Sequence, residues 1–431
     1  MKKVITYGTF DLFHEGHFNI LKRAKEYGDY LIVAVTGESY DCERGKLSVH
    51  DSIDTRIQNV KNTGLADEII IEEYLGQKIS DIIKNDVDTF VIGDDWRGKF
   101  DHLSQYCNLV YLERTQGISS TKIRQETFDF YKIGIISDDA WDGFMTKEAN
   151  AVVGFDVSSV FIENKETLCK FQKKFPDLHV ANSAEELVND VDIVYVRTDI
   201  SKKFETIKQA LEAKKHVIAN VPFTLDSKKQ AELFNIAQEN SVLLIDNIKM
   251  VYLRLFFQML WIVKGNLLGD IYSFKCSISY DNEDDLTDYE YMLTLSICVM
   301  IKLLGVDFSS MKETIKRTNS GEVAYASLAF TYNDVMAVID IGNKVPLRNR
   351  LEIVGETGTL LCENEWWLPS YFEIRRPEAE KVEKYSSNFD GNGLKYILRE
   401  MKNLLNNKAN YSKCLFPDES IKIIEIMEKL I

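Results

Sequence analysis

The chain has 431 residues, of which 45% are hydrophobic and 28% are charged, as is typical of soluble globular proteins. At about 100–200 residues per domain, this length allows two or three domains. The formal net charge is −15, so neither nucleic acid nor an anionic membrane surface is expected as a partner. No stretch reaches the roughly 18 apolar residues of a membrane-spanning helix, so membrane insertion is not expected either.

The N-terminus and the cysteines indicate the cellular compartment. The sequence begins with a strand-like run that has neither the apolar core nor the small-residue cleavage site of a signal peptide. Seven cysteines are scattered without a C-x-x-C pair, which favours reduced thiols over disulfides or a zinc site. We therefore expect a cytoplasmic protein.

Strands alternate with helices from the first residues onward. Apolar runs predict strands at 3–7, 30–36, 68–71, 89–92 and 109–112, and amphipathic stretches predict helices at 18–26, 52–63 and 76–84. This alternation is typical of a parallel sheet with helices on both faces. Residues 1–128 are thus predicted to form one doubly wound α/β domain.

The alternation restarts near residue 131 and changes after residue 250. Strands are expected at 131–137, 157–162, 193–196, 216–219 and 242–245, with helices at 165–174, 183–189, 201–213 and 227–239. Residues 129–250 are therefore interpreted as a Rossmann-like domain. Further on, helices are expected at 251–266 and 288–304, and strands at 271–279, 322–332, 335–343, 351–355 and 359–363. Residues 251–431 are predicted to form an α+β domain whose antiparallel sheet carries helices on one face.

The first motif whose residues could bind a ligand or catalyse a reaction lies between the first predicted strand and the first predicted helix. It reads Gly8-Thr9-Phe10-Asp11, followed by His14-Glu15-Gly16-His17. Ligands of parallel sheets bind beyond the carboxyl ends of the strands, where a helix N-terminus attracts anions. Two imidazoles one turn apart, with a glycine between them, could contact a triphosphate and stabilise charge at its α-phosphorus. No metal site is expected here, because zinc would need a third ligand nearby.

A second motif follows the fifth predicted strand. It reads Arg114-Thr115-Gln116-Gly117-Ile118-Ser119-Ser120-Thr121-Lys122-Ile123-Arg124. Its hydroxyl residues are typical of a helix N-cap, where hydroxyl and backbone N–H groups could bind the β- and γ-phosphates. Arg114 could pair with a phosphate bidentately.

Together these motifs resemble the nucleotidyltransferase superfamily and, within it, the glycerol-3-phosphate cytidylyltransferase family. The similarity runs nearly without gaps over residues 1–126. Its most specific segments are 2–11, His14, Gly16, His17, 93–96, 98–101, Arg114, Thr115 and 117–123.

The resemblance implies a role for each matching residue. Catalysis would depend on His14, His17, Lys46 and Arg114. CTP would be held by Thr9, Phe10, His14, Glu15, Gly16, His17, Lys46, Asp95, Arg114, Thr115, Gln116, Gly117, Ile118, Ser119, Ser120 and Thr121. The acceptor would be bound by Arg44, Lys78 and Arg56. Arg44 stands where the family has lysine, which keeps the charge but changes the hydrogen-bond geometry.

The reaction that this resemblance implies is transfer of CMP from CTP to glycerol 3-phosphate, which gives CDP-glycerol and pyrophosphate. Mg²⁺ is expected as a cofactor on the CTP phosphates. Ribitol 5-phosphate and phosphocholine are alternative acceptors. The resemblance also implies teichoic-acid or capsule biosynthesis as the use of the product, and a homo-oligomer such as a dimer.

Residues 131–431 resemble the glucose–fructose oxidoreductase / inositol dehydrogenase family. The similarity rests on 191–196, 210–217, 220–222, 265–271 and 353–360. The family's glycine-rich pyrophosphate turn is replaced by Ser137-Asp138-Asp139. Val221 stands where the family has its catalytic lysine, and the family's Asp and His align with Thr294 and Cys298. No histidine lies beyond His216, which excludes a histidine acid/base in the last domain. Because the pyrophosphate turn and the proton-transfer residues are lost together, NAD(P) binding and hydride transfer are not expected.

Two other interpretations stay open. The second half could be an active NAD(P)-dependent oxidoreductase, which would make the chain a bifunctional enzyme. Alternatively, the whole chain could be a non-catalytic nucleotide-binding scaffold. The intact set of His14, His17, Lys46 and Arg114 argues against a scaffold.

Overall fold

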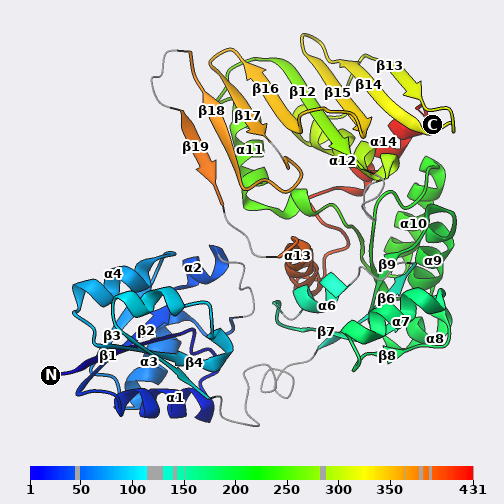
Figure 1. The fold of residues 1–431 in the computed structure, drawn as a ribbon. Coiled ribbons are helices and arrows are strands. Elements are labelled where there is room, and N and C mark those ends of the chain that lie inside the picture. The colour runs from blue at the N-terminus through cyan, green and yellow to red at the C-terminus, as the bar shows by residue number, and fades with distance from the viewer. Residues whose placement is uncertain are drawn as a thin grey trace. The chain divides into compact units, whose positions relative to one another are not determined.

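A computed structural model of the chain describes residues 1–43, 49–113, 130–138, 143–149, 151–281, 288–363, 365–377, 382–387 and 391–430. The chain divides into two compact units, Met1–Phe130 with Asn150–Gly154 and Tyr131–Ala149 with Phe155–Ile431 (Figure 1). They are called the first and the second unit below, and each is described by itself.

The first unit is built on a parallel sheet with the strand order β3-β2-β1-β4-β5. Its strands are β1 (Lys3–Gly8), β2 (Tyr30–Thr36), β3 (Glu68–Glu72), β4 (Thr89–Gly93) and β5 (Asn108–Leu112). Its helices are α1 (Glu15–Lys25), α2 (Glu38–Glu43), α3 (Ile53–Asn62), α4 (Gln77–Lys84) and the 3-10 helices η1 (Asp94–Trp96) and η2 (Asp101–Gln105).

Apolar clusters cover both faces of this sheet. One cluster joins the strands to Leu21 of α1 and Val60 of α3, and another joins them to Ile82 of α4 and Leu103 of η2. The valine- and isoleucine-rich strands are therefore buried on both sides, as in other parallel sheets. The strand order reverses between β1 and β4, so the crevice at their carboxyl ends is where such a sheet binds ligands.

The second unit begins with another parallel sheet, with the order β11-β10-β9-β6-β7-β8. Its strands are β6 (Tyr131–Ser137), β7 (Phe155–Phe161), β8 (His179–Val180), β9 (Ile193–Arg197), β10 (His216–Ala219) and β11 (Leu244–Asp246). Its helices are α6 (Gly143–Ala149), α7 (Lys165–Lys174), α8 (Ala184–Asp190), α9 (Ile200–Glu212) and α10 (Ser227–Glu239). Here the strand order reverses between β6 and β9.

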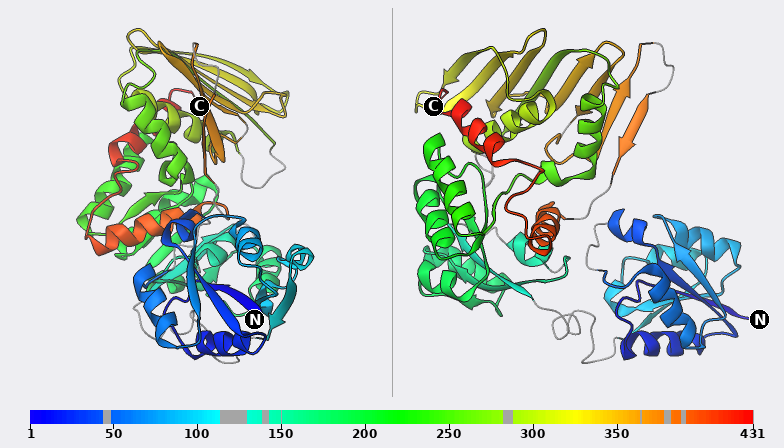
Figure 2. Two further views of the ribbon diagram at one scale, coloured as in Figure 1. Left: turned by 90° about the vertical axis from the view of Figure 1, so that its left-hand side faces the viewer. Right: turned by 180° about the vertical axis from the view of Figure 1, so that it is seen from behind.

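An eight-stranded sheet completes the second unit, with the order β13-β14-β15-β12-β16-β17-β18-β19. In the right-hand view of Figure 2 its strands, coloured green to orange, lie side by side. Its strands are β12 (Ile271–Tyr280), β13 (Ser310–Arg317), β14 (Val323–Thr331), β15 (Met336–Asn343), β16 (Arg350–Gly355), β17 (Gly358–Glu363), β18 (Tyr371–Arg375) and β19 (Glu383–Ser386). Neighbouring strands are antiparallel except β12 and β15, which pair in parallel.

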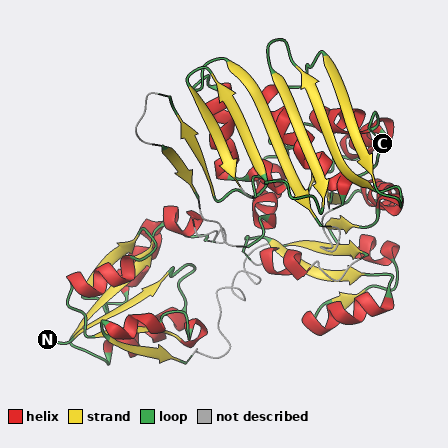
Figure 3. Cartoon of the chain, turned by 45° about the horizontal axis from the view of Figure 1, so that its top comes forward, coloured by secondary structure: helices red, strands yellow, loops and turns green. Residues whose placement is uncertain are grey.

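Helices lie against one face of this sheet (Figure 3). The helices of this part are η4 (Lys249–Tyr252), α11 (Arg254–Lys264), α12 (Tyr289–Leu304), α13 (Leu394–Asn406) and α14 (Pro417–Met427). Residues of α12 are buried around most of the helix, because α12 contacts both the sheet and α14. No helix among the described residues is long and apolar enough to cross a membrane.

The predicted fold class is confirmed: a doubly wound sheet is followed by a Rossmann-like sheet and a largely antiparallel one. Strands β13, β18 and β19 and helices α13 and α14 were not predicted. β13 has an exposed, polar sequence that shows no apolar face. The helix predicted at 251–266 is wrong at its start, because the chain forms η4 before α11 begins.

Candidate active site

Two imidazole rings stack at the carboxyl end of β1. His14 is the N-cap of α1, and its Nδ1 accepts a hydrogen bond of 3.1 Å from the backbone N–H of Gly16. The rings of His14 and His17 lie 3.9 Å apart, centre to centre, with 17° between their planes. Because Nδ1 of a neutral His14 accepts this bond, its proton resides on Nε2. A donor at the N-terminus of α1 is suited to a phosphate oxygen.

Gly16 is required by the fold of this motif. A Cβ atom at Gly16 would lie 2.9 Å from Cε1 and 3.0 Å from Nδ1 of His14, closer than side chains pack. The glycine thus lets the imidazole of His14 fold back onto the helix N-terminus. The sequence suggested that Gly16 gives room to a ligand, and the structure adds this intramolecular reason.

The loop before His14 has an unusual backbone. Phe10 and Leu12 have positive φ values of 54° and 47°, a conformation that non-glycine residues rarely adopt. Between them, the buried carboxylate of Asp11 accepts hydrogen bonds from the backbone N–H groups of His50 (2.9 Å) and Asp51 (2.8 Å). Asp51 in turn accepts a bond of 3.0 Å from the N–H of Leu12. These bonds tie the loop to the segment just before α3.

Arg56 supports the same loop from inside the protein. Its side chain is 0% exposed and donates to the carbonyl oxygens of Thr9 (3.0 Å), Thr36 (2.7 Å) and Asp51 (3.0 Å). It also forms an ion pair of 3.6 Å with the buried Asp41. This guanidinium is therefore enclosed by the protein and does not face the crevice. The predicted contact of Arg56 with the acceptor stays a prediction that would need the side chain to move.

Lys78 lies at the crevice with an acidic partner. It pairs with Glu72, which is buried at the end of β3 and also accepts a hydrogen bond of 3.1 Å from Thr36. The Nζ atom lies 4.4 Å from the centre of the Tyr7 ring. Burial, and then the hydrogen bond to Asp81, raise the pKa of Tyr7, so this ring stays neutral beneath the lysine. The position of Lys78 is compatible with its predicted role at the acceptor.

The other predicted nucleotide contacts are only partly within the described residues. Glu15 is exposed in the first turn of α1, and Asp95 is exposed in η1, directly after β4. Thr9 is half-buried, whereas Phe10 is 2% exposed and packs against the ring of His17. Phe10 could thus reach a nucleotide only through its backbone. The predicted residues outside the described ranges are Arg44, Lys46, Arg114, Thr115, Gln116, Gly117, Ile118, Ser119, Ser120 and Thr121.

The buried acids of this site had no role in the sequence analysis. Asp11 was part of the first motif, and its place directly before H-x-G-H was the available signal. Nothing in the sequence marks Asp41 or Glu72 as buried, because their burial and their pairing with Arg56 and Lys78 arise only in the folded chain. Within the described ranges, no group of three or more His, Cys, Asp or Glu side chains is placed to hold a metal ion.

In the second unit, charged side chains cross the carboxyl edge of the parallel sheet. Asp138, directly after β6, accepts a hydrogen bond of 2.8 Å from the N–H of Asp199. Lys202 lies 2.6 Å from Glu163, which follows β7, and 3.9 Å from Asp138. The hydrogen bond to Glu163 is the main cause of a raised pKa at Lys202. Asp138 stands where a dinucleotide-binding sheet begins its glycine-rich turn, and Glu163 stands where such a sheet has the carboxylate that contacts the ribose.

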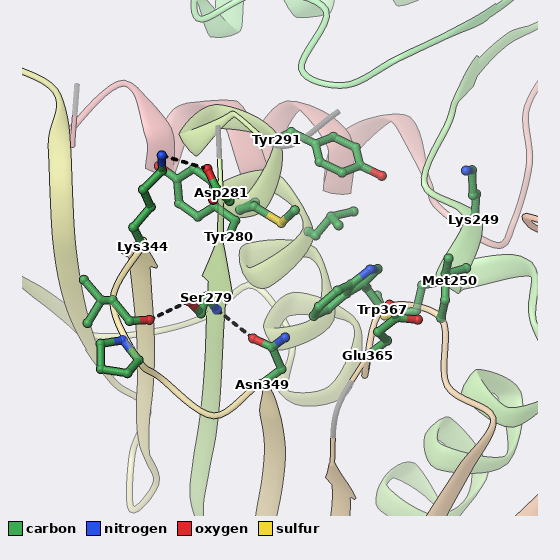
Figure 4. Close-up of a pocket in the computed structure, with 15 residues that line it drawn as sticks. Lys249, Met250, Ser279, Tyr280, Asp281, Tyr291, Lys344, Asn349, Glu365 and Trp367 are labelled. Atoms are coloured by element: carbon green, nitrogen blue, oxygen red, sulfur yellow. Dashed lines mark hydrogen bonds and ion pairs between the residues drawn. The ribbon is translucent and has the colours of Figure 1, made fainter. Parts of the chain in front are cut away.

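A cavity of about 750 Å³ opens between α12 and the ends of the antiparallel strands (Figure 4). The residues of α12 that line it are Tyr291, Met292 and Leu295. Thr294 and Cys298, which the sequence aligned with the family's Asp and His, are instead buried outside the lining, and Thr294 Oγ1 lies 3.3 Å from Met427 of α14. Thr294 and Cys298 thus do not line this cavity, and the lining residues of α12 include no histidine or carboxylate.

Comparison with known proteins relates the two units to two different families. A cytidylyltransferase-like family model matches residues 5–126, and the model of an oxidoreductase family with an NAD-binding Rossmann fold matches residues 133–247. The chain is 54% identical over 126 residues to a glycerol-3-phosphate cytidylyltransferase of Bacillus spizizenii. It is 48% identical over 128 residues to one of Staphylococcus aureus. These matches cover 29% and 30% of this chain, and 97% and 96% of the relatives.

The second unit is similar in fold to solved oxidoreductases. A 3-ketoreductase from Actinomadura kijaniata, solved in complex with NADP and TDP-benzene, matches 70% of this chain and 96% of its own with a TM-score of 0.60. The sequence identity is 19%, so this likeness shows the fold alone.

Stacked histidines at a helix N-terminus, at the switch point of a doubly wound sheet, define the first unit as a nucleotidyltransferase. Through this unit the chain belongs to the glycerol-3-phosphate cytidylyltransferase family. The second unit carries the Rossmann domain of the oxidoreductase family.

Because Arg56 is buried, substitution can test whether it stabilises the fold or binds the acceptor. Arg56→Met removes the cation beside Asp41 and the donors to Thr9, so the first unit is expected to lose about 3–5 kcal/mol of stability. Calorimetric melting of the full chain measures this loss. Lys61→Met, on an exposed position of α3, is the matched control and should melt like the unchanged chain. An Arg56→Met chain with normal melting and a raised KM for the acceptor would instead support direct acceptor binding.

Proposed function

We propose that the chain transfers CMP from CTP to glycerol 3-phosphate and releases pyrophosphate. The observation that carries this proposal is 54% identity over almost the whole length of a named glycerol-3-phosphate cytidylyltransferase, with the H-x-G-H histidines folded at a helix N-terminus. Ribitol 5-phosphate and phosphocholine remain alternative acceptors, because Arg44 replaces the family's lysine.

The chemistry needs positioning and charge stabilisation more than a strong base. A phosphate oxygen of the acceptor attacks the α-phosphorus of CTP, the bond to the β-phosphate breaks, and pyrophosphate leaves with its electron pair. The acceptor is already a phosphate anion, so no proton needs to be removed first. Nε2–H of His14 and the N–H groups at the start of α1 would stabilise the charge on the reacting phosphate. Lys78 would orient the acceptor, and Glu72 would orient Lys78.

Mg²⁺ would be coordinated mainly by the phosphates of the nucleotide and not by the protein. The donor set at the carboxyl end of β1 consists of imidazole and backbone N–H groups, which suit phosphate oxygens and not a hard cation. Bound by the CTP phosphates, Mg²⁺ would neutralise part of their charge. Use of the product in teichoic-acid or capsule polymers and assembly as a homo-oligomer are parts of the same proposal and are drawn from the family resemblance. Location in the cytoplasm is also part of it and is inferred from the N-terminal sequence and the scattered cysteines.

For the second unit we propose that hydride transfer has been lost. The residues present do not fit an NAD(P) cofactor, because Asp138 stands at the start of the pyrophosphate turn and Lys202 pairs with Glu163, the carboxylate at the ribose position. Val221, at the position of the family's catalytic lysine, is apolar and 3% exposed. Among the residues of α12 that line the cavity, none donates a proton readily at neutral pH, because burial raises the pKa of Tyr291 to about 12.

The stacked histidines predict a large kinetic effect. His14→Ala and His17→Ala should each lower the turnover number by about 100-fold or more, since each removes stabilisation of the developing phosphate charge. Steady-state pyrophosphate release measures this, and circular dichroism verifies the fold. His102→Ala, at an exposed position in η2, should behave like the unchanged chain. Near-normal turnover in both motif variants would exclude the proposed role of the motif.

The acceptor can be identified by pyrophosphate release from CTP with Mg²⁺. Glycerol 3-phosphate is expected to support faster release than ribitol 5-phosphate or phosphocholine, because the similarity extends through the whole first unit. The assay compares the full chain with residues 1–130, and activity lost in the short chain would make the second unit an obligate structural partner. Faster release with ribitol 5-phosphate would overturn the acceptor assignment.

Because the second unit is proposed to lack a cofactor site, we predict that the chain does not bind NADH or NADPH tightly. NADH and NADPH fluorescence should show no saturable change at micromolar concentrations of the full chain, because carboxylates repel the pyrophosphate. The double variant Asp138→Gly with Lys202→Ala is a useful comparison, since it removes the ion pairs at this edge. Saturable binding by the unchanged chain would favour the bifunctional enzyme.

A further inference from the structure

The ammonium group of Lys78 is held by one carboxylate and two aromatic rings. It donates to Glu72, the last residue of β3, and its Nζ lies 4.4 Å from the centre of the Tyr7 ring and 5.3 Å from that of Phe100. The face of an aromatic ring attracts a cation, and more strongly where water is excluded. Glu72 and Tyr7 are both buried, so these contacts are largely shielded from solvent.

A buried carboxylate holds the Tyr7 ring in turn. The hydroxyl of Tyr7 donates a hydrogen bond of 2.8 Å to Oδ2 of Asp81, which lies on α4 one turn after Lys78. Asp81 is buried as well, so water does not compete for this bond. A phenol that donates to a carboxylate gains electron density in its ring, which strengthens the attraction for a cation. Tyr7 and Asp81 thus act on Lys78 through both geometry and charge.

The first residue of α4 fixes the backbone that carries Lys78. The N-cap residue of this helix makes no side-chain capping bond. Instead, the side-chain amide of Gln77 donates 2.7 Å to the carbonyl oxygen of Ile71 in β3 and 3.2 Å to Asp81. Its Oε1 accepts a bond of 2.7 Å from the N–H of Glu73. The start of α4 is therefore tied to the end of β3, and Lys78 is the next residue along the chain.

This arrangement prepares a cation for an anionic ligand. Lysine has a flexible stem, and ordering that stem upon binding lowers affinity. The contacts described above restrict Lys78 before a ligand arrives. The aromatic faces hold the ammonium group without adding a negative charge that would compete with a phosphate. Tyr7 and Glu72 lie at the carboxyl ends of β1 and β3, on the same edge of the sheet as the H-x-G-H motif.

We propose that Tyr7 and Asp81 are positioning residues for the acceptor, because they hold the ammonium group of Lys78 where it receives the acceptor's phosphate. In this role neither residue touches a substrate, and their effect on the reaction passes through Lys78. The inference rests on the proposed function, in which Lys78 orients the acceptor. Substitution of Tyr7 therefore changes the KM of the acceptor and leaves the KM of CTP unchanged.

Steady-state pyrophosphate release by the full chain tests this role. Tyr7→Leu should raise the KM of glycerol 3-phosphate by about tenfold and leave the KM of CTP within about twofold, as expected for loss of a desolvated cation–π contact. Tyr7→Phe keeps the ring and loses only the bond to Asp81, so it should raise the KM of the acceptor by about threefold. Circular dichroism and thermal melting verify the fold of each variant.

Tyr30 is the matched control. It packs against the same apolar cluster as Tyr7, and its hydroxyl also donates to a carboxylate, that of Glu68, at 3.3 Å. It is the first residue of β2 and so lies at the opposite edge of the parallel sheet from the candidate site. Tyr30→Leu and Tyr30→Phe should keep the acceptor KM of the unchanged chain. Equal acceptor KM values in Tyr7→Leu and Tyr30→Leu overturn the inference, and so does a parallel rise in the KM of CTP.

A double-variant cycle separates positioning from a general effect on folding. Lys78→Met should raise the acceptor KM, and adding Tyr7→Leu to that chain should raise it no further, because Tyr7 acts through Lys78. Additive effects of the two substitutions overturn the inference.

Failure of the proposed function gives a different result. An unchanged chain that releases pyrophosphate with ribitol 5-phosphate or phosphocholine, and not with glycerol 3-phosphate, refutes the acceptor assignment alone. The same variants are then compared with that acceptor, and the same outcomes decide the role of Tyr7. Absence of release with all three acceptors overturns the proposed function and this inference together.

Discussion

The fold of the candidate active site depends on two charged groups buried beneath one loop. Phe10 and Leu12 adopt left-handed backbone conformations that cost about 1–2 kcal/mol each for ordinary residues. The loop keeps this shape because Asp11 accepts two backbone N–H groups and Arg56 donates to the carbonyl of Thr9. A buried charge is tolerated only where it is paired and hydrogen-bonded. The stacked histidines are thus positioned by groups that do not themselves face the crevice.

The sequence predicted the elements whose residues follow a clear apolar period, and these include all the strands of the first unit. It missed β13 because that strand is an exposed edge with polar residues on both faces, so no apolar alternation is present. The sequence analysis also missed the burial of Arg56, because an arginine near phosphate-binding motifs was interpreted as a residue that binds the acceptor. Its ion pair with Asp41 and its bond to Thr9 join segments that only the folded chain brings together. Likewise, helical register, and not sequence similarity, decides that Tyr291 and Leu295 line the cavity in place of Thr294.

The two parallel sheets of this chain carry different side chains at the carboxyl ends of their strands. In the first unit, the crevice at the end of β1 presents a helix N-terminus, a glycine and imidazole donors, all of which favour an anion. In the second unit, the corresponding edge after β6 presents Asp138 and the Glu163–Lys202 pair. These ion pairs partly neutralise one another. The two edges therefore differ in their side chains, and not in the architecture of the sheets.

The core of the second unit is apolar at positions that the family resemblance assigns to catalytic residues. The helix α12 is held by apolar contacts with the sheet and with α14, and Val221 is buried where the family has a lysine. An apolar side chain in a buried position avoids the desolvation cost of a buried ammonium. The walls of the cavity beside α12 are parts of the same core. The fold of the second unit therefore depends on these apolar contacts and does not itself decide whether a cofactor binds.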